Sequence, residues 1–321
     1  MSNTDLHIAR QNNADEFYTG YDDIAAEMNY YPDVFRNKSV FLPCDDYTKS
    51  AFYRFFKDNF ETLGLASLTA QSLYPAKWVF YNGTEEVVHD TDDGDFRGKS
   101  AYVLMQLSDI IVTNPPFSLF REFMQLLLQM NKQFIVLGNV NAITYKEIMP
   151  GLVNRHIFLG PSIRQGDREF LVPDDYQLDG TACRYDAVNK KKYIRVKGVR
   201  WFTNIQSEWT SSNIPELTKS INDQEYKKFD TYDAINVNAT ADIPYDYEGE
   251  MGVPITALDK SCSDGLIRFR HNDKVLKYRL TGMLNSGNRP ESWDFAKPII
   301  DGKCKFKRIL LQRSEQTSTT T

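Results

Sequence analysis

The segment Asp109–Glu122 reads DIIVTNPPFSLFRE, and it combines the two signals from which we predict the fold. Asp109–Thr113 is a short apolar run rich in β-branched residues, which is typical of a strand buried on both faces. Phe120–Met130 follows as an apolar helix, for which Ser118 is the expected N-cap. Between the two, Asn114–Phe117 forms a proline-rich turn at the carboxyl end of the strand. The segment therefore predicts one βα unit.

Runs of the same two kinds alternate through the first two-thirds of the chain. We predict further strands at Ser39–Pro43, Leu65–Leu73, Gln133–Leu137 and Arg155–Leu159. We predict helices at Asp22–Met28 and at Ser50–Leu63, which ends at Gly64. This alternation predicts an α/β fold with parallel strands, in which ligands bind at the carboxyl ends of the strands. The polar segments in that position are Cys44–Asp46, Asn114–Phe117 and Asn139–Asn141.

The composition is that of a globular chain of 321 residues, with 41% hydrophobic and 25% charged residues. It contains no run of 18 apolar residues, and residues 1–13 lack the apolar core of a secretory signal. We expect four parts along the chain. They are a flexible lead-in at 1–14, a catalytic core at 15–200, a sheet-completing and substrate-facing region at 201–313, and a disordered tail at 314–321.

The net charge of −5 is unevenly distributed, because residues 181–321 carry +5 and residues 1–180 carry −10. Basic clusters interleaved with aromatic residues occupy Asn189–Arg200, Arg268–Arg279 and Lys303–Arg313, which suits a surface that follows a phosphate backbone. Lys303, Lys305 and Lys307 alternate as in a strand with one basic face. The candidate DNA-binding residues are Lys190, Lys191, Lys192, Arg195, Lys197, Arg200, Arg268 and Arg270.

Asn114–Phe117 suits methyl transfer to the exocyclic amine of adenine. The lone pair of that nitrogen is delocalised into the ring, and a site localises it by accepting hydrogen bonds from both of its hydrogens. Asn114 offers a side-chain carbonyl and Pro115 a backbone carbonyl, held rigid by two consecutive prolines. Phe117 offers a face on which an extruded base stacks. Methylases of cytosine N4 and of glutamine amides share this class of motif.

Two acidic segments are candidates for binding the methyl donor, S-adenosylmethionine. In the run Asp92–Phe96, the Asp95 carboxylate suits the amine of the donor's adenine and Phe96 its ring face. Cys44, Asp45 and Asp46 follow a predicted strand, where many methyltransferases have a glycine-rich loop. Here the glycines are missing, and we expect Asp45 or Asp46 to contact the donor's ammonium group. Aspartate at a helix N-cap is the alternative interpretation of this segment.

The chain resembles the EcoRI-type adenine-specific DNA methyltransferases, the modification enzymes of type II restriction systems. The matching segments are Asp15–Thr19, Cys44–Asp46, Gly94–Arg97, Asp109–Glu122, Gly138–Glu147, Tyr232–Asn238 and Gly252–Thr256. The resemblance implies a Rossmann-like class I methyltransferase fold with a mixed seven-stranded sheet, followed by a DNA-recognition region. It also implies S-adenosylmethionine as cofactor, a flipped adenine in double-stranded DNA, no metal, a monomer, and functional pairing with a restriction endonuclease.

The order of the motifs resembles the γ arrangement of amino-methyltransferases, in which a segment near the start closes over the cofactor. This implies cofactor contacts for Phe17, Tyr18 and Thr19, besides those of Asn114. The resemblance makes GAATTC a candidate recognition sequence.

Two alternatives stay open from the sequence. One is methylation of RNA or of a protein glutamine, and the other is a DNA-binding protein with an inactive methyltransferase core, which the glycine-poor loop at Cys44–Asp46 would suit. The four cysteines and four histidines show no metal-ligand spacing, so we expect free thiols in a reducing cytoplasm and no zinc site.

Overall fold

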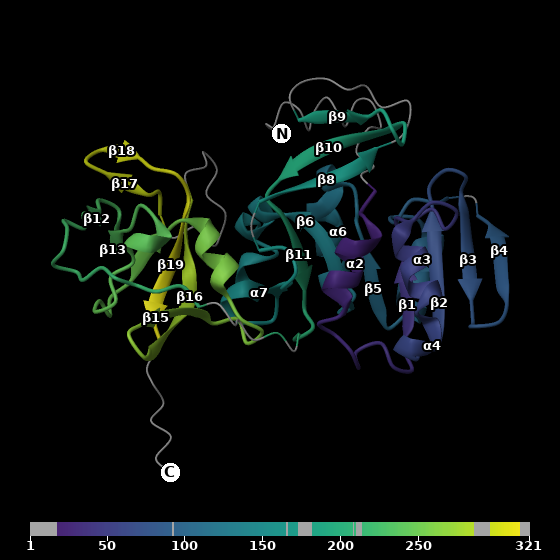
Figure 1. Cartoon of the computed structure of the whole chain (residues 1–321), viewed down its shortest axis with the longest axis horizontal. Helices are drawn as coiled ribbons and strands as arrows, with labels where there is room; N and C mark the ends of the chain where they lie inside the picture. Colours follow the sequence, from purple (N-terminus) through teal and green to yellow (C-terminus); the bar gives the residue numbers. More distant parts are fainter. Residues whose placement is uncertain are drawn as a thin grey trace, which may run out of the picture. The chain divides into compact units, whose positions relative to one another are not determined.

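The computed structural model describes residues 18–91, 93–164, 166–172, 182–207, 209, 214–285 and 296–314 (Figure 1). The chain packs as two compact units, Met1–Ala142 with Gly160–Ser207, and Ile143–Leu159 with Glu208–Thr321. The division at Ser207 lies close to the boundary expected at residue 200, but residues 143–159 group with the second unit. The predicted lead-in, Phe17, and the predicted tail beyond Ser314 lie outside the described residues.

The main sheet of the first unit is mixed, with four parallel strands at its centre. These are, in spatial order, β2 (Ser67–Ser72), β1 (Ser39–Leu42), β5 (Ile110–Thr113) and β6 (Gln133–Asn139). The antiparallel strands β3 (Lys77–Tyr81) and β4 (Glu86–Asp90) extend one side, and β11 (Val199–Thr203) the other. The full order is β4-β3-β2-β1-β5-β6-β11-β7, where β7 (Phe158–Leu159) has two residues. The sheet thus has eight strands and not the expected seven.

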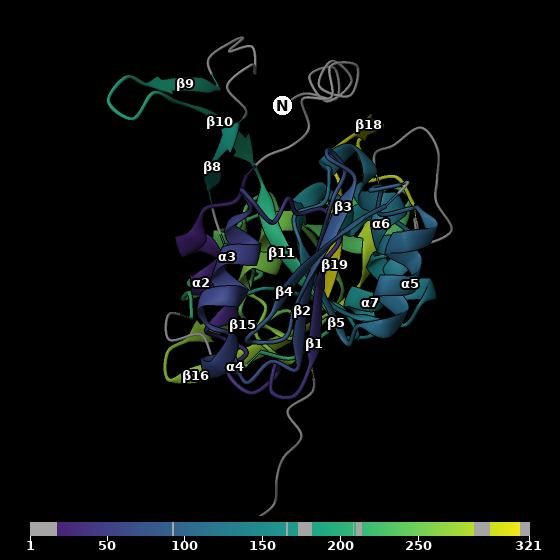
Figure 2. The ribbon, with the colours of Figure 1, turned by 90° about the vertical axis from the view of Figure 1, so that its right-hand side faces the viewer.

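Helices cover both faces of this sheet (Figure 2). On one face lie α2 (Tyr21–Met28), α3 (Ala51–Asp58) and α4 (Phe60–Leu63), and on the other α5 (Lys99–Leu107) and α6 (Phe120–Gln129). Since both faces are covered, β1 and β5 are apolar at consecutive positions, and all four residues of β5 are buried. The α/β class and the strands predicted around the catalytic motif are therefore confirmed.

Two helix ends differ from expectation. α6 begins after Leu119, the last residue of the 3₁₀ turn η1 (Phe117–Leu119). The N-cap predicted at Ser118 is therefore wrong, because that residue lies inside the turn. The helix predicted over 50–63 is interrupted at Asn59, which separates α3 from α4. It ends as predicted at Gly64, whose φ of 65° is left-handed and favours glycine.

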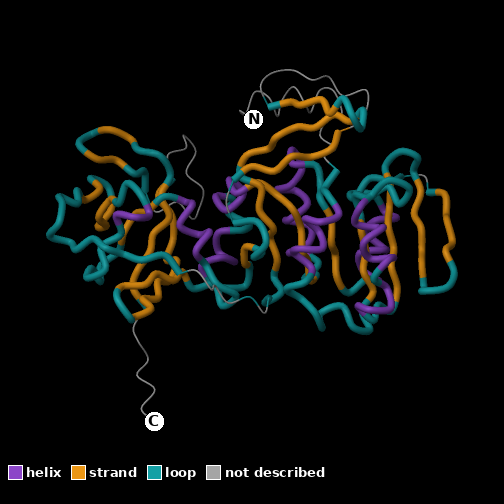
Figure 3. The backbone as a smooth tube through the Cα atoms, in the orientation of Figure 1, coloured by secondary structure: helices purple, strands orange, loops and turns teal. Residues whose placement is uncertain are grey.

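A small antiparallel sheet also belongs to the first unit (Figure 3). Its order is β8-β10-β9, with β8 (Asp167–Val172), β10 (Lys191–Lys197) and β9 (Cys183–Asp186). We call this element the arm, because it projects from the main sheet of its unit (Figures 1 and 2). Phe170, Val172, Ile194 and Val196 are buried in the same core as the main sheet, so one face of the arm is anchored.

The second unit forms a sheet of its own and does not only complete the first one. Six strands follow the order β12 (Lys228–Phe229), β13 (Tyr232–Asn236), β14 (Met251–Val253), β19 (Arg308–Arg313), β16 (Lys274–Leu284) and β15 (Ile267–His271). The unit also contains α7 (Met149–Val153), η4 (Ile255–Lys260) and the pair β17 (Ile299–Ile300) and β18 (Lys303–Cys304). The helix η3 (Thr240–Asp242) belongs to it too, whereas η2 (Val140–Thr144) lies where the first unit gives way to the second.

Two strands predicted in this part of the chain are shorter in the structure than the sequence suggested. The strand expected at 155–159 is only β7, because Arg155 adopts a left-handed φ of 59°. The basic strand face expected for Lys303, Lys305 and Lys307 does not form, since β18 ends at Cys304 and β19 begins at Arg308. The four cysteines are free thiols. Within the described residues, no helix is long and apolar enough to cross a bilayer.

Candidate active site

The carboxyl ends of β1, β2 and β5 meet at one edge of the main sheet, which we call the carboxyl edge. The backbone N–H of Asp45, after β1, donates to the carbonyl of Gln71 at the end of β2, at 3.0 Å. The hydroxyl of Thr113, at the end of β5, donates to Asp45 Oδ2 at 2.6 Å. The segments predicted from the sequence to carry the chemistry therefore come together in the fold.

The segment Asn114–Phe117 leaves this edge directly after the buried strand β5. Asn114 is half-buried and Pro115 is buried. The ring of Phe117 is 9% exposed and meets Phe170 of β8 edge-on, with centroids 6.3 Å apart. The segment is thus held between the main sheet and the arm.

The loop after β1 separates its two aspartates by environment. Cys44 is half-buried, while Asp45 is 7% exposed, and burial raises the pKa of its carboxyl to about 6. Asp46 is half-buried and accepts hydrogen bonds from the backbone N–H and hydroxyl of Thr48, at 3.0 and 2.7 Å. Only Asp46 therefore keeps partial access to solvent.

Tyr18 and Thr19, predicted to close over the cofactor, lie beside the arm. The backbone N–H of Tyr18 donates to the carbonyl of Leu171 in β8, at 2.9 Å. The neighbouring residue in β8, Phe170, contacts Phe117. The hydroxyl of Thr19 is buried and has no hydrogen-bond partner among the described residues. β8 thus connects the start of the described chain to Asn114–Phe117, which we call the catalytic segment after its predicted role.

Asp95 and Phe96 lie next to the end of β2. The carbonyl of Asp95 accepts from Gln71 Nε2 at 3.4 Å, and a Cβ added at Gly94 would lie 2.1 Å from the Ser72 carbonyl, which only glycine allows. Both carboxylate oxygens of Asp95 accept from Arg97, at 2.8 and 2.6 Å, which lowers the pKa of Asp95.

The ring of Phe96 is 4% exposed and packs edge-on against Phe123 of α6, with centroids 5.0 Å apart. Phe96 is therefore part of the packing beside the carboxyl edge. Its contact with the cofactor's adenine stays a prediction, as does that of Asp95.

Sequence reasoning missed three polar residues of this edge. Thr113 is fully buried and bonds to Asp45, while Ser50 bonds to the other oxygen of that carboxylate, at 2.7 Å. Gln71 is fully buried and joins the segments at Asp45 and Asp95. A signal existed for Thr113, since it is the one hydroxyl in an otherwise apolar strand.

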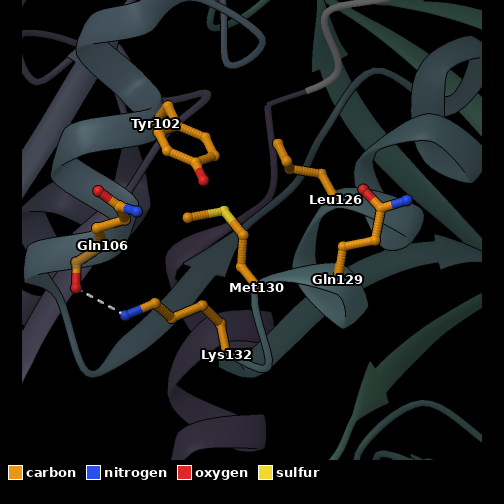
Figure 4. A pocket seen from close by; sticks show the side chains of 6 residues that line it. All are labelled: Tyr102, Gln106, Leu126, Gln129, Met130 and Lys132. Atoms are coloured by element: carbon orange, nitrogen blue, oxygen red, sulfur yellow. Dashed lines mark hydrogen bonds between the residues drawn. The ribbon is translucent and has the colours of Figure 1, made fainter.

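A cavity of about 400 Å³ lies between α5 and α6, at the other edge of the sheet (Figure 4). Its lining consists of Tyr102, Gln106, Leu126, Gln129, Met130 and Lys132. Lys132 Nζ donates to the carbonyls of Gln106 and Ser108, at 2.9 and 2.7 Å. Since Lys132 directly precedes β6, this cavity lies at the amino ends of the strands and is separate from the catalytic segment.

The predicted DNA-binding residues divide by exposure. On the arm, Lys190, Lys191, Arg195 and Lys197 are exposed and Lys192 is half-buried. Glu169 of β8 forms ion pairs with Arg184 at 2.9 Å and with Arg195 at 3.8 Å. Arg200 of β11 is 3% exposed and so does not share this surface.

In the second unit, the two candidate arginines of β15 also differ. Arg268 forms a bidentate ion pair with Asp264, at 2.6 and 2.8 Å, and is half-buried. Arg270 is exposed. Only Arg270 of this pair presents an exposed side chain to a phosphate.

Comparisons with known proteins identify the family to which the chain is similar. The profile of the family described as adenine-specific methyltransferase EcoRI matches residues 5–92 and 80–314. The chain is 38% identical to the type II methyltransferase M.EcoRI of Escherichia coli over 330 aligned positions, covering 96% of this chain and 95% of that relative. It is 36% identical to the type II methyltransferase M.MpnI of Mycoplasma pneumoniae, covering 78% of this chain and 80% of the relative. No solved structure matches the chain. The chain therefore belongs to the EcoRI family of adenine-specific DNA methyltransferases.

Proposed function

We propose that the enzyme methylates the exocyclic N6 of one adenine within a specific double-stranded DNA sequence, with S-adenosylmethionine as the methyl donor. One observation supports this most directly: Asn114 and Pro115 follow the buried central strand β5, beside the loop that follows β1. In α/β sheets, that position is where ligands bind.

Asn114 and Pro115 activate the amine in this proposal. The side-chain oxygen of Asn114 and the backbone carbonyl of Pro115 accept one hydrogen bond each from the two N6 hydrogens. The nitrogen lone pair would then form the bond to the donor's methyl group while the bond between that methyl group and the sulfonium sulfur breaks. One N6 proton would leave to water afterwards, which gives neutral N6-methyladenine and the thioether product. Two fixed carbonyl dipoles stabilise the positive charge that develops on the nitrogen, and they need no reorganisation during the step. No covalent bond between enzyme and base is required.

The carboxyl edge suits a donor that carries an adenosine and an amino acid. The Thr19 hydroxyl is buried without a partner among the described residues, and Cys44 and Asp46 are half-buried at the same edge as Asp95. We assign cofactor contacts to these residues, to Tyr18, Phe17 and Phe96, and to Asn114. When bound, the donor supplies an electrophilic methyl group on a sulfonium.

Phe117 and the arm act on the DNA in this proposal. An adenine inside a duplex is out of reach, so it must be extruded, at a cost of a few kcal/mol. Stacking on Phe117 offsets part of that cost, and phosphate contacts offset the rest. We assign these contacts to Lys190, Lys191, Lys192, Arg195 and Lys197 of the arm and to Arg270, and we leave out the buried Arg200 and the paired Arg268.

The deciding experiment expresses the protein in a bacterial host that lacks adenine methylation. Sequencing of its genomic DNA with modified-base detection is expected to show N6-methyladenine at one recurrent sequence, for which GAATTC is the candidate. Cells that express Asn114→Ala at the same level serve as the control and are expected to show none. In parallel, the purified protein is offered DNA, RNA and protein with radiolabelled S-adenosylmethionine. Label in RNA or protein but not in DNA would refute the proposal.

A further inference from the structure

A chain of buried hydrogen bonds links the catalytic segment to the start of helix α3. Thr113 donates to Asp45 Oδ2 at 2.6 Å, and Ser50 donates to Asp45 Oδ1 at 2.7 Å. The Ser50 oxygen in turn accepts from the backbone N–H groups of Phe52 and Tyr53, the first turn of α3. The side chains of Thr113, Ser50 and Asp45 are 0%, 6% and 7% exposed.

The bond between Thr113 and Asp45 lies just beyond the point where the pairing of β5 with β1 ends. Strand β5 pairs with β1 only through Ile110 and Ile111, opposite Val40 and Phe41. On its other side, β5 stays paired with β6 up to Thr113 itself. Toward β1, the registered pairing of β5 therefore stops before Val112 and Thr113, and the hydrogen bond from the Thr113 side chain to Asp45 is a tether on that side. The next residue in the chain is Asn114.

Asp45 is poorly suited to bind the cofactor directly. Each of its carboxylate oxygens already accepts a short hydrogen bond from a hydroxyl of the same chain, and its backbone N–H is bonded to Gln71. The neighbouring Asp46 is more accessible and is the better candidate for an ammonium group. Burying a charged carboxylate is costly unless it is fully hydrogen-bonded, so an arrangement of this kind indicates a structural task.

We propose that Asp45 is a positioning residue, which holds the carbonyl acceptors of Asn114 and Pro115 in place through the hydroxyl of Thr113. This inference rests on the proposed function of those acceptors. With its pKa raised to about 6, Asp45 is ionised at neutral pH and accepts from both hydroxyls. A misplacement of about 1 Å at a reacting centre costs about 100-fold in rate, so a loosened tether lowers kcat without changing what binds.

The test compares Thr113→Val with Thr113→Ser, because valine has the shape of threonine without its donor and serine keeps the donor. Thr113→Val is expected to lower the single-turnover methylation rate about 10- to 100-fold. The Kd for S-adenosylmethionine, measured by calorimetry, is expected to stay within about twofold. Thr113→Ser is expected to retain most of the rate. Thr69→Val, the same change at a buried position of strand β2, which β1 separates from β5, is the control and is expected to leave the rate unchanged.

Asp45→Asn tests the other partner and covers the case in which Thr113→Val does not fold. A positioning role predicts a lower kcat at an unchanged Kd, and a double variant with Thr113→Val no slower than the worse single one. A direct cofactor contact predicts a Kd that rises for Asp45→Asn alone, and this would overturn the inference. Equal rates for wild type and Thr113→Val would also overturn it.

The unaltered enzyme is assayed first, which separates the two proposals. If it transfers no methyl group to adenine, the proposed function fails, and the role of Asp45 fails with it. If it methylates adenine and Thr113→Val is equally fast, only the positioning role fails.

Discussion

The carboxyl edge and the arm belong to the same unit of the chain, but a carboxylate is buried at the edge and exposed on the arm. At the edge, the carboxylate of Asp45 is buried and accepts from two hydroxyls at 2.6 and 2.7 Å. On the arm, the carboxylate of Glu169 is exposed to solvent and shared between Arg184 and Arg195. The buried carboxylate is bonded to two neutral hydroxyls, whereas the exposed carboxylate lies between two cations.

This difference matches the role that we propose for each region. Methyl transfer needs acceptors fixed before the reaction, which buried and fully bonded groups provide. A DNA surface needs cations that can leave their carboxylate for a phosphate. Exposed ion pairs contribute only about 0–1 kcal/mol, so Arg195 changes partner at little cost. We therefore expect changes at the edge to alter kcat and changes on the arm to alter DNA affinity and its salt dependence.

The largest effect is expected for Asn114→Ala, which removes one of the two acceptors. Loss of one preorganised group of this kind costs about 100- to 1,000-fold in kcat. We expect a fall of that size in the single-turnover rate, and a much smaller rise in the Kd values for DNA and S-adenosylmethionine, both of which Asn114 contacts in the proposed function.

The control for this change is Asn139→Ala, at the carboxyl end of the adjacent strand β6. Asn139 bonds to Lys197 and Asn141 within the protein, so its loss is expected to lower stability more than rate. If Asn114→Ala retained most of its activity, the role proposed for Asn114 would be wrong. The expectation that changes at the carboxyl edge alter kcat would then lose its main support.

The contributions of Asp45 and Glu169 to the unfolding free energy are expected to change in opposite directions as the pH rises. Burial raises the pKa of Asp45 from 3.8 to about 6, so the folded state favours the protonated carboxyl. The nearby charge of Asp46 also raises it, while the bonds from Ser50 and Thr113 oppose the shift. The stability contributed by Asp45 is therefore complete below pH 3.8 and is lost as the pH rises through about 6.

Urea unfolding at pH 4 and pH 7 measures this effect. The unfolding free energy of wild type relative to Asp45→Asn is expected to fall by about 2 kcal/mol between these values. Hydrogen bonding to Arg184 lowers the pKa of Glu169, so the difference between wild type and Glu169→Gln is expected to rise with pH instead. That rise is small, because solvent screens an exposed group. A pH-independent difference for Asp45→Asn would contradict its burial.

The sequence predicted the strands around Asn114–Phe117 well, for physical reasons that are local. Strands such as β1 and β5 are buried on both faces, so their apolar runs stand out, and the turn after β5 is defined by its prolines. The partnership of Asp45 with Thr113 was not predictable, because 68 residues separate them and only the parallel pairing of β1 with β5 brings them together.

The same limit explains the errors elsewhere. The sequence showed that the arm is basic, but not that Glu169 lies opposite Arg195, since strand register is a tertiary property. Arg200 follows the arm in sequence but belongs to β11, a fully buried strand, so the basic cluster ended one strand earlier than predicted. The sheet of the second unit depends on pairings between distant strands, and its sequence shows no βα alternation.

A smaller effect is expected for Phe117→Ala, because stacking on an aromatic side chain contributes about 1–3 kcal/mol per base. We expect a fall of about tenfold in the methylation rate, and weaker fluorescence from 2-aminopurine placed at the target adenine, which reports extrusion. Phe117→Tyr keeps a ring and is the control, expected to restore both signals. Equal extrusion by the alanine variant and the wild type would show that Phe117 contributes only its packing against Phe170.

The smallest effect is expected on the arm, where single contacts are exchangeable. Arg195→Gln is expected to weaken DNA binding severalfold and to reduce the slope of log K against log salt by about 0.9, the loss of one phosphate contact. Lys38→Gln removes the same charge at the amino end of β1, at the edge away from the catalytic segment, and is expected to leave the slope unchanged. Binding is measured by fluorescence anisotropy between 50 and 200 mM salt. If Arg195→Gln lowered kcat and left the salt slope unchanged, the arm would take part in catalysis. The proposed contrast between the carboxyl edge, which acts on kcat, and the arm, which acts on DNA affinity, would then be wrong.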